Sequence, residues 1–204
     1  MNHTSRTFFK SVLTLLFLAC FLGGVTHSTA KNKSLPERDS AAPNLSGYKT
    51  WTKVNPKPEL IPSPIAKLCN MPPPKLVERE KNNPHNEKYL TVYVNQTGKH
   101  AMLQEVKPHF PLGSVVVKEK LPTAESTTPE LLTVMVKREA GFNPECGDWE
   151  FFVFDGKGSQ VQGRGKIETC QTCHRLQKEE DFLYRWRYLP REVRQRLRPG
   201  AAAE

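Results

Sequence analysis

Trp149-Glu150-Phe151-Phe152-Val153-Phe154-Asp155 is the stretch that decides the fold class, because four aromatic residues and a valine within seven positions are typical of a buried β-strand. Asp155-Gly156-Lys157-Gly158 follows and is a strong turn sequence, which predicts a hairpin into a second strand over Gln160–Lys166. Three upstream segments are also rich in β-branched or aromatic residues: Tyr89–Asn95, Ser114–Leu121 and Leu131–Arg138.

Turn residues separate these strands, and no long helical pattern lies between them, so we expect a mostly antiparallel sheet with a few helices, an α+β fold. Short helices are expected near Pro64–Cys69 and within Gly98–His109. The segment Thr169–Leu189 is helix-permissive, and Pro190 interrupts it. Its apolar side would consist of Leu176, Phe182, Leu183 and Trp186.

Cys170-Gln171-Thr172-Cys173-His174 opens this helical segment and is a complete CxxCH sequence, the attachment motif for c-type haem. Two thiols one turn apart can each form a thioether with a haem vinyl group, and the following histidine is placed to bind the iron. A zinc site would need a second Cys/His pair, and a redox CxxC would need a βαβ context; the sequence has neither. We therefore predict one covalent haem packed by the fold, with His174 as iron ligand.

Two basic residues lie just upstream of this motif. Arg164 and Lys166 are candidates for neutralising the haem propionates. Solvent-exposed strand charges are an equally good interpretation of both.

Residues 1–30 have the pattern of a cleavable secretory signal. Arg6 and Lys10 supply the positive start, Ser11 to Val25 is largely apolar, and Ser28-Thr29-Ala30 offers small residues for cleavage. A retained anchor is one alternative, and a lipoprotein through Cys20 is another. Because haem attachment of this type takes place outside the cytoplasm, we expect an exported, bacterial, periplasmic protein. Residues 31–46 would form a polar leader, residues 47–190 the haem-binding domain and residues 191–204 a basic tail.

The chain carries a formal net charge of +9, and cleavage after residue 30 removes Arg6 and Lys10 and no acids, which leaves +7. Much of the excess lies late in the sequence. A solvated helix face is the favoured interpretation, and an acidic soluble redox partner or anionic lipid is the alternative. Export argues against nucleic acid. The late basic residues are Arg164, Lys166, Arg185, Arg187, Arg191, Arg194, Arg196 and Arg198.

Five cysteines become four after cleavage. With Cys170 and Cys173 assigned to haem, Cys69 and Cys146 remain, and two spare thiols in an oxidising compartment commonly pair. We therefore predict a Cys69–Cys146 disulfide. Closing so long a loop would stabilise the fold by about 4 kcal/mol on the chain-entropy model.

The sixth iron ligand would decide between electron transfer, which suits a methionine ligand, and gas binding or catalysis, which suit an open site. Met71, Met102 and Met135 are the candidates, although Met135 lies in an apolar strand where core packing is the usual role.

Lys118 is the other notable residue. Alternation along Ser114–Leu121 places it on the face opposite Glu119, and valines lie on both faces, so the strand is expected to be largely buried.

Four motifs in order resemble the cytochrome P-460 family, which includes the cytochrome c prime beta proteins. The likeness covers roughly residues 47–190. The motifs are Gly47–Asn55 (GYKTWTKVN), Gly113–Glu119 (GSVVVKE), Gly147–Phe152 (GDWEFF) and Cys170–His174 (CQTCH).

The resemblance implies an antiparallel sheet with helices, one haem and commonly a homodimer. In cytochrome P-460 itself a lysine bonds to the porphyrin ring, a carboxylate over the open iron face accepts protons, and the enzyme oxidises hydroxylamine. Lys118 matches that lysine. The strand in which the carboxylate is expected instead contains Thr133 and Met135, and Glu130 and Glu139 lie outside it. An apolar distal side with these two residues would suit nitric oxide or another small neutral ligand.

We therefore expect a periplasmic mono-haem cytochrome that binds or oxidises small nitrogen species, nitric oxide or hydroxylamine, at an open iron site. Whether it is an oxidoreductase is left open by the missing carboxylate. The alternative is a six-coordinate electron-transfer cytochrome with Met102 or Met135 as the sixth ligand.

Overall fold

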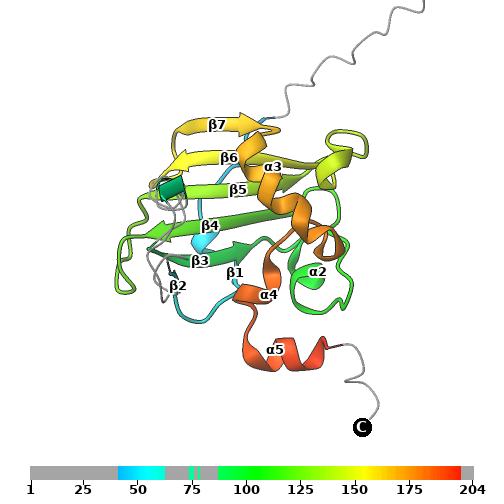
Figure 1. The fold of residues 1–204 in the computed structure, drawn as a ribbon, viewed down its shortest axis with the longest axis horizontal. Coiled ribbons are helices and arrows are strands. Elements are labelled where there is room, and N and C mark those ends of the chain that lie inside the picture. The colour runs from blue at the N-terminus through cyan, green and yellow to red at the C-terminus, as the bar shows by residue number, and fades with distance from the viewer. Residues whose placement is uncertain (1–40, 63–73, 76–77, 79–86, 199–204) are drawn as a thin grey trace, which may run out of the picture. The chain divides into compact units, whose positions relative to one another are not determined.

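One antiparallel sheet organises the part of the chain that the computed structural model describes, residues 41–62, 74–75, 78 and 87–198 (Figure 1). The strands lie in the order β1-β3-β4-β5-β6-β7, and β2 pairs with β3 beside β1. All pairings are antiparallel, which confirms the expected fold class. The strands are β1 (Thr52–Lys53), β2 (Glu59–Ile61), β3 (Lys88–Val94), β4 (Val115–Leu121), β5 (Leu131–Lys137), β6 (Trp149–Asp155) and β7 (Val161–Gly165).

The helices of the described residues are short. The α-helices are α2 (Lys99–Leu103), α3 (Glu168–His174), α4 (Arg185–Tyr188) and α5 (Arg191–Arg196). The 3₁₀ helices are η1 (Tyr48–Thr50), η3 (Pro144–Cys146) and η4 (Arg175–Glu180). No described helix has the length and apolar content that a membrane crossing requires. The predicted signal 1–30 and the predicted helix near Pro64–Cys69 lie outside the described residues.

Side chains from alternating positions of the strands form two apolar clusters, one on each face of the sheet. One face is covered by α3 and the segments after it, and we call it the α3 face (Figure 1). Its core residues from the strands are Leu90, Val92, Val94, Val116, Met135, Trp149 and Phe151. The opposite face, here the far face, carries Tyr93, Val115, Val117, Leu132, Val134, Val136, Phe152 and Phe154.

The first described residues cover the far face. Leu45 and Tyr48 are buried in its cluster, and the Tyr48 hydroxyl donates a hydrogen bond of 2.6 Å to the buried Glu119 carboxylate. At the other end of the domain, Leu197 is 2% exposed in the α3-face cluster. The folded unit, which begins at Ala41, therefore takes in residues that the sequence assigns to the leader and the tail.

The segment expected to be helical over Thr169–Leu189 is broken into α3, η4 and α4. Asp181 and Phe182 have φ values of 48° and 64°, in the left-handed region that cannot continue a right-handed helix. Leu176, expected on the apolar side, is 76% exposed, whereas Phe182 and Leu183 are buried. The break lies seven residues after His174, beyond η4, and turns the chain back toward the sheet.

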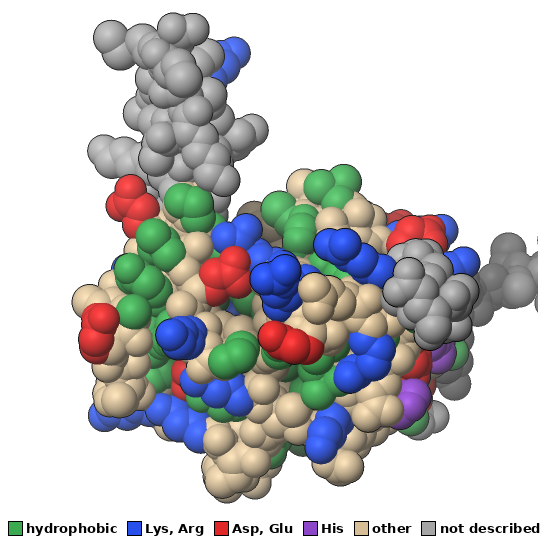
Figure 2. All heavy atoms as spheres, turned by 90° about the horizontal axis from the view of Figure 1, so that it is seen from below, with side chains coloured by type: hydrophobic (Ala, Val, Ile, Leu, Met, Phe, Trp, Pro, Cys, Tyr) green, Lys and Arg blue, Asp and Glu red, His purple; other side chains and the backbone are tan. Residues whose placement is uncertain are grey.

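Several of the late basic residues are used by the fold. Arg185 is 1% exposed, and its guanidinium donates to the carbonyls of Ala101, Met102, Glu105 and Val106 at the end of α2. Arg187 pairs with Glu59, and Arg196 donates to Leu103 O. On the face shown in Figure 2, lysine and arginine side chains alternate with acidic and neutral ones. Arg185, Arg187 and Arg196 therefore connect segments of the fold that are distant in sequence.

Candidate functional site

The CxxCH motif occupies most of α3. Cys170 and Cys173 are three residues apart on this helix, so both thiols lie on nearly the same side, one turn apart. Cys170 packs against the α3-face cluster and Cys173 is exposed, and both are free thiols. Ile167 before the helix has an extended backbone, and the Glu168 carboxylate in the first turn accepts from Arg175. The sheet therefore supports one thiol and leaves the other accessible.

The His174 ring is held from three sides. Its Nδ1–H donates a 2.6 Å hydrogen bond to the carbonyl oxygen of Phe182, because a carbonyl can only accept. The rings of Phe151 and Tyr184 pack edge-on against the imidazole, with centroids 5.3 and 5.5 Å away. Since Nδ1 carries the proton, the lone pair of Nε2 is available to a metal.

Burial also keeps this imidazole neutral. It lowers the pKa of His174 to about 4, with the positive charge of Lys118 acting in the same direction and the Phe182 hydrogen bond opposing both. A neutral imidazole with a fixed tautomer is the form that ligates iron.

Lys118 lies on the α3 face, as its alternation with Glu119 predicts. Val92, Lys118, Thr133 and Val153 form one row across β3, β4, β5 and β6. Burial, and then the neighbouring charge of Lys120, lower the pKa of Lys118 to about 8. The side chains of Cys170 and Cys173 influence this amine electrostatically, so the structure brings Lys118 and CxxCH together.

Thr133 has a buried Oγ1 without a hydrogen-bond partner among the described residues. A buried hydroxyl is normally satisfied, so the unpaired Oγ1 on the α3 face marks a position where a polar partner is missing. Thr133 and Lys118 are the polar members of their cross-strand row.

The methionines are packed in the core. Met135 is 8% exposed and lies between Val116 and Phe151 in the ladder, so it contacts the same aromatic residue that packs on His174. Met102 is 1% exposed in α2 and belongs to the same cluster. Met71 lies outside the described residues.

The structure does not bring Arg164 to the CxxCH motif. Arg164 pairs in the ladder with Phe152, which places it on the far face, where its guanidinium binds Glu150 at 3.1 Å. Lys166 is exposed, with its ammonium 5.4 Å from the centre of the Phe142 ring.

Cys146 is a fully buried free thiol, and burial raises its pKa to about 11. The predicted Cys69–Cys146 disulfide is therefore not shown, and Cys69 lies outside the described residues.

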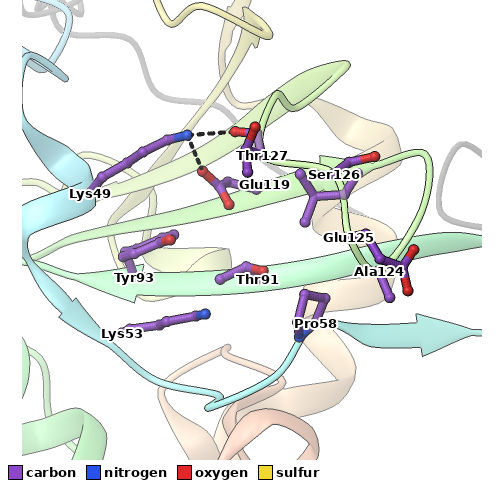
Figure 3. Close-up of a pocket in the computed structure, with 11 residues that line it drawn as sticks. Lys49, Lys53, Pro58, Thr91, Tyr93, Glu119, Ala124, Glu125, Ser126 and Thr127 are labelled. Carbon is purple, nitrogen blue, oxygen red and sulfur yellow. Dashed lines mark hydrogen bonds and ion pairs between the residues drawn. The ribbon is translucent and has the colours of Figure 1, made fainter.

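A pocket of about 290 Å³ opens on the far face (Figure 3). Lys49 spans it, with its ammonium 2.8 Å from the Thr127 carbonyl oxygen and 3.6 Å from Glu119. Because the sheet separates this pocket from Cys170, Cys173 and His174, it is no part of the CxxCH site.

Two groups at the site were missed by the sequence reasoning. Lys120 is 3% exposed on the α3 face, and burial lowers its pKa to about 8. Its position two residues after Lys118 was the available signal. The Phe182 carbonyl had no signal, because it is a backbone atom brought to His174 by the chain reversal.

An antiparallel sheet covered by a CxxCH helix, with an oriented neutral histidine, defines a candidate c-type haem protein. Residues 74–185 match the family model described as Cytochrome P460, which covers more than half of the chain, so the protein belongs to the cytochrome P460 family. This membership supports a c-type haem cytochrome and implies a haem cofactor. No curated protein matches the chain.

The residues present fit that cofactor. Cys170 and Cys173 offer two free thiols, His174 offers an unprotonated Nε2, and the unpartnered Thr133 hydroxyl faces the same side of the sheet.

Proposed function

We propose that this protein is a mono-haem c-type cytochrome that binds a small neutral nitrogen ligand, nitric oxide above all, at the haem iron. Cys170 and Cys173 would hold the haem through thioethers, and His174 would ligate the iron through Nε2. A bound haem supplies a coordination position for a small ligand and a one-electron redox couple.

The observation that carries this proposal is the chemistry of the strand residues on the α3 face. The central row and the row of Val94, Val116, Met135 and Phe151 beside it consist of apolar side chains, one amine, one hydroxyl and one thioether; among the strand residues of these two rows that the structure describes, none is a carboxylate. The row on the other side ends in Asp155, whose carboxylate is occupied by hydrogen bonds from Ser159 and Gln160 in the turn after β6. Oxidation of hydroxylamine requires the loss of protons to a base within hydrogen-bond reach. A neutral diatomic ligand needs no such base.

The chain's own residues have separate roles in this proposal. The Phe182 carbonyl fixes the His174 tautomer, and Phe151 and Tyr184 shield the imidazole from water. The Thr133 hydroxyl is free to donate to a bound ligand. Apolar neighbours such as Val92 and Met135 exclude water from the same face.

Lys118 is proposed to form a covalent bond to the porphyrin, as the family resemblance implies. The half-buried amine on the α3 face and the low pKa of about 8 support this, because a deprotonated amine is the nucleophilic form. The new bond would replace an amine N–H and a porphyrin C–H, so its formation would also need a two-electron oxidant such as a peroxide.

Export to the bacterial periplasm, a soluble redox partner and a homodimer are also proposed. The signal-like residues 1–30 and the attachment motif support export. The dimer rests on the family resemblance alone.

The test uses holoprotein matured in a host that attaches c-type haem. Nitric oxide is titrated into the ferrous protein, and hydroxylamine turnover is measured with an artificial electron acceptor. We expect a five-coordinate high-spin spectrum, stoichiometric nitric oxide binding and negligible turnover.

A low-spin spectrum with methionine-to-iron absorption would contradict the open site and favour electron transfer through Met135 or Met102. Rapid hydroxylamine turnover would also contradict the proposal, and it would direct attention to Lys120 as the base. The matched comparison is Thr133→Glu, which adds a carboxylate to the central row and is expected to raise turnover above the unmodified protein.

A further inference from the structure

Lys137 lies at the end of β5 on the α3 face and makes a buried ion pair with Asp181. Its ammonium is 2.7 Å from both carboxylate oxygens, and each side chain is 8% exposed. The ammonium also lies 5.0 Å from the centre of the Trp149 ring. A buried pair of this kind holds its geometry because separating the charges in a low-dielectric interior is costly.

Asp181 is held by two further hydrogen bonds. The Phe110 amide donates to its carboxylate at 2.8 Å, and the Trp149 indole N–H donates to its carbonyl oxygen at 2.8 Å. Three elements distant in sequence therefore fix one residue: the loop before β4, the end of β5 and the start of β6.

These contacts hold Asp181 and Phe182 in an unfavourable backbone conformation. Asp181 and Phe182 both have positive φ, a strained conformation for residues other than glycine that persists only where the surrounding structure holds it. The space beside them is full, because a Cβ at Gly147 would lie 2.5 Å from the Phe182 ring and 2.9 Å from an Asp181 carboxylate oxygen. Packing and the ion pair thus hold the reversal together.

The reversal brings one functional group to the candidate site, the carbonyl oxygen of Phe182. This oxygen accepts a 2.6 Å hydrogen bond from His174 Nδ1–H. A short hydrogen bond at Nδ1 raises the electron density of the imidazole and so the basicity of Nε2. A more basic histidine ligand would stabilise the ferric iron relative to the ferrous iron.

We propose that Lys137 is a positioning residue for the iron ligand: through Asp181 it holds the Phe182 carbonyl against His174 and thereby keeps the reduction potential of the haem low. This inference rests on the proposed role of His174 as the iron ligand.

The test compares holoproteins carrying Lys137→Met, Lys137→Arg or no change. Two quantities are measured, the midpoint potential by spectroelectrochemistry and the iron–histidine stretching frequency of the ferrous protein by resonance Raman spectroscopy. Lys137→Met is expected to shift the potential upward and the stretching frequency downward. Lys137→Arg keeps a cation for Asp181 and is expected to restore most of both values.

Arg138→Met is the matched control. Arg138 is the next residue, and it also pairs with a buried carboxylate, Glu150, at 2.6 Å, but on the far face. Its loss weakens the fold without touching the Asp181–Phe182 reversal, so both measured values should stay at those of the unmodified protein.

The outcomes separate this inference from the proposed function. If the unmodified ferrous protein shows no iron–histidine vibration, the proposed five-coordinate site with His174 as the protein ligand fails. If it shows one and Lys137→Met leaves potential and frequency unchanged, or Arg138→Met shifts them equally, the positioning role is overturned. Should Lys137→Met not accumulate, Lys137→Gln, which removes the charge and keeps a donor, is expected to shift both values in the same directions by less. If Lys137→Gln left both the midpoint potential and the stretching frequency unchanged, the inference would likewise be overturned.

Discussion

Lys118 and Thr133 are direct partners in the β4–β5 ladder, and both side chains project from the face of the sheet that α3 covers. The amine has a pKa lowered to about 8, and the hydroxyl oxygen is buried without a partner among the described residues. Polar chemistry is thus concentrated at one position of an apolar surface, close to the thiols of α3.

The first prediction concerns covalent attachment. Cys170→Ala and Cys173→Ala should each leave one thioether, and the double variant should retain haem only non-covalently, so that denaturation removes it. Intact-mass spectrometry of denatured protein checks this directly. Cys146→Ala is the control: it should keep the full haem mass but lower the free energy of unfolding by about 1–3 kcal/mol, because it leaves a small cavity in the core.

Lys118→Ala should abolish any covalent bond between the chain and the porphyrin ring beyond the thioethers. Tryptic haem peptides would then contain only the Cys170–His174 segment, and a red-shifted ferrous Soret band would return to an ordinary position. Lys120→Ala, which removes the other amine of the same strand face, should leave the crosslink in place. A crosslink that survives Lys118→Ala would show that another residue forms it.

Thr133→Val should accelerate dissociation of nitric oxide about fivefold, since it removes a donor worth about 1 kcal/mol to a bound ligand. Stopped-flow trapping of the released ligand measures the rate. Thr91→Val is the matched control, because Thr91 is a buried threonine in strand β3 that lines the pocket on the far face. Equal rates for Thr133→Val and the unmodified protein would remove Thr133 from the ligand site.

The buried amine of Lys120 predicts an unusual pH dependence. Burial lowers its pKa from 10.5 to about 8, so between these pH values the unfolded chain binds a proton that the folded chain does not. The contribution of Lys120 to the free energy of unfolding therefore rises with pH from about 8 to 10.5. Below pH 8 the folded chain bears the full cost of burying the charged amine.

Lys120→Met should accordingly be more stable than the unmodified protein below pH 8, by up to about 3 kcal/mol, and lose this advantage by about pH 10.5. Urea unfolding across this range measures the difference, in which contributions from tyrosines shared by both proteins cancel. Lys107→Met, at an exposed position, should show a small difference at every pH. A constant advantage for Lys120→Met would contradict the assignment.

Arg185→Met should lower the free energy of unfolding by about 3 kcal/mol or more, because it leaves four backbone carbonyls and Glu180 without their buried cation. Arg187→Met removes a guanidinium two residues away whose ion pair with Glu59 is partly exposed, and the cost should stay near 0.5 kcal/mol. Similar costs for the two variants would argue against the structural role of Arg185.

The local sequence pattern was sufficient to predict the long strands. β6 has the bounds that its aromatic residues predict, and β4 places Lys118 and Glu119 on opposite faces as alternation requires. The short strands β1 and β2 were missed because they have two and three residues in a proline-rich region, and they form by pairing with the edge of β3.

The remaining differences between expectation and structure involve long-range partners. Nothing local marks Asp181 and Phe182 for positive φ; Lys137 and Trp149, more than 30 residues away, hold them there. Arg164 was considered for the propionates because only its distance along the chain from CxxCH was known. Its face depends on the register with Phe152 across a bulged hairpin, which a single sequence does not reveal.

The adjacent Lys118 and Glu119 give β4 a polarity across the thickness of the sheet, with an amine on the side of α3 and a carboxylate sealed beneath Tyr48. A shift of one residue in the register of this strand would place the Glu119 carboxylate on the α3 face and the Lys118 amine on the far face. Deleting one residue before Val115 and restoring one after Leu121 would thus present an acid where the natural protein presents a base. The same shift would move every other side chain of β4 to the opposite face, so the exchange of acid and base would come with a repacking of both apolar clusters.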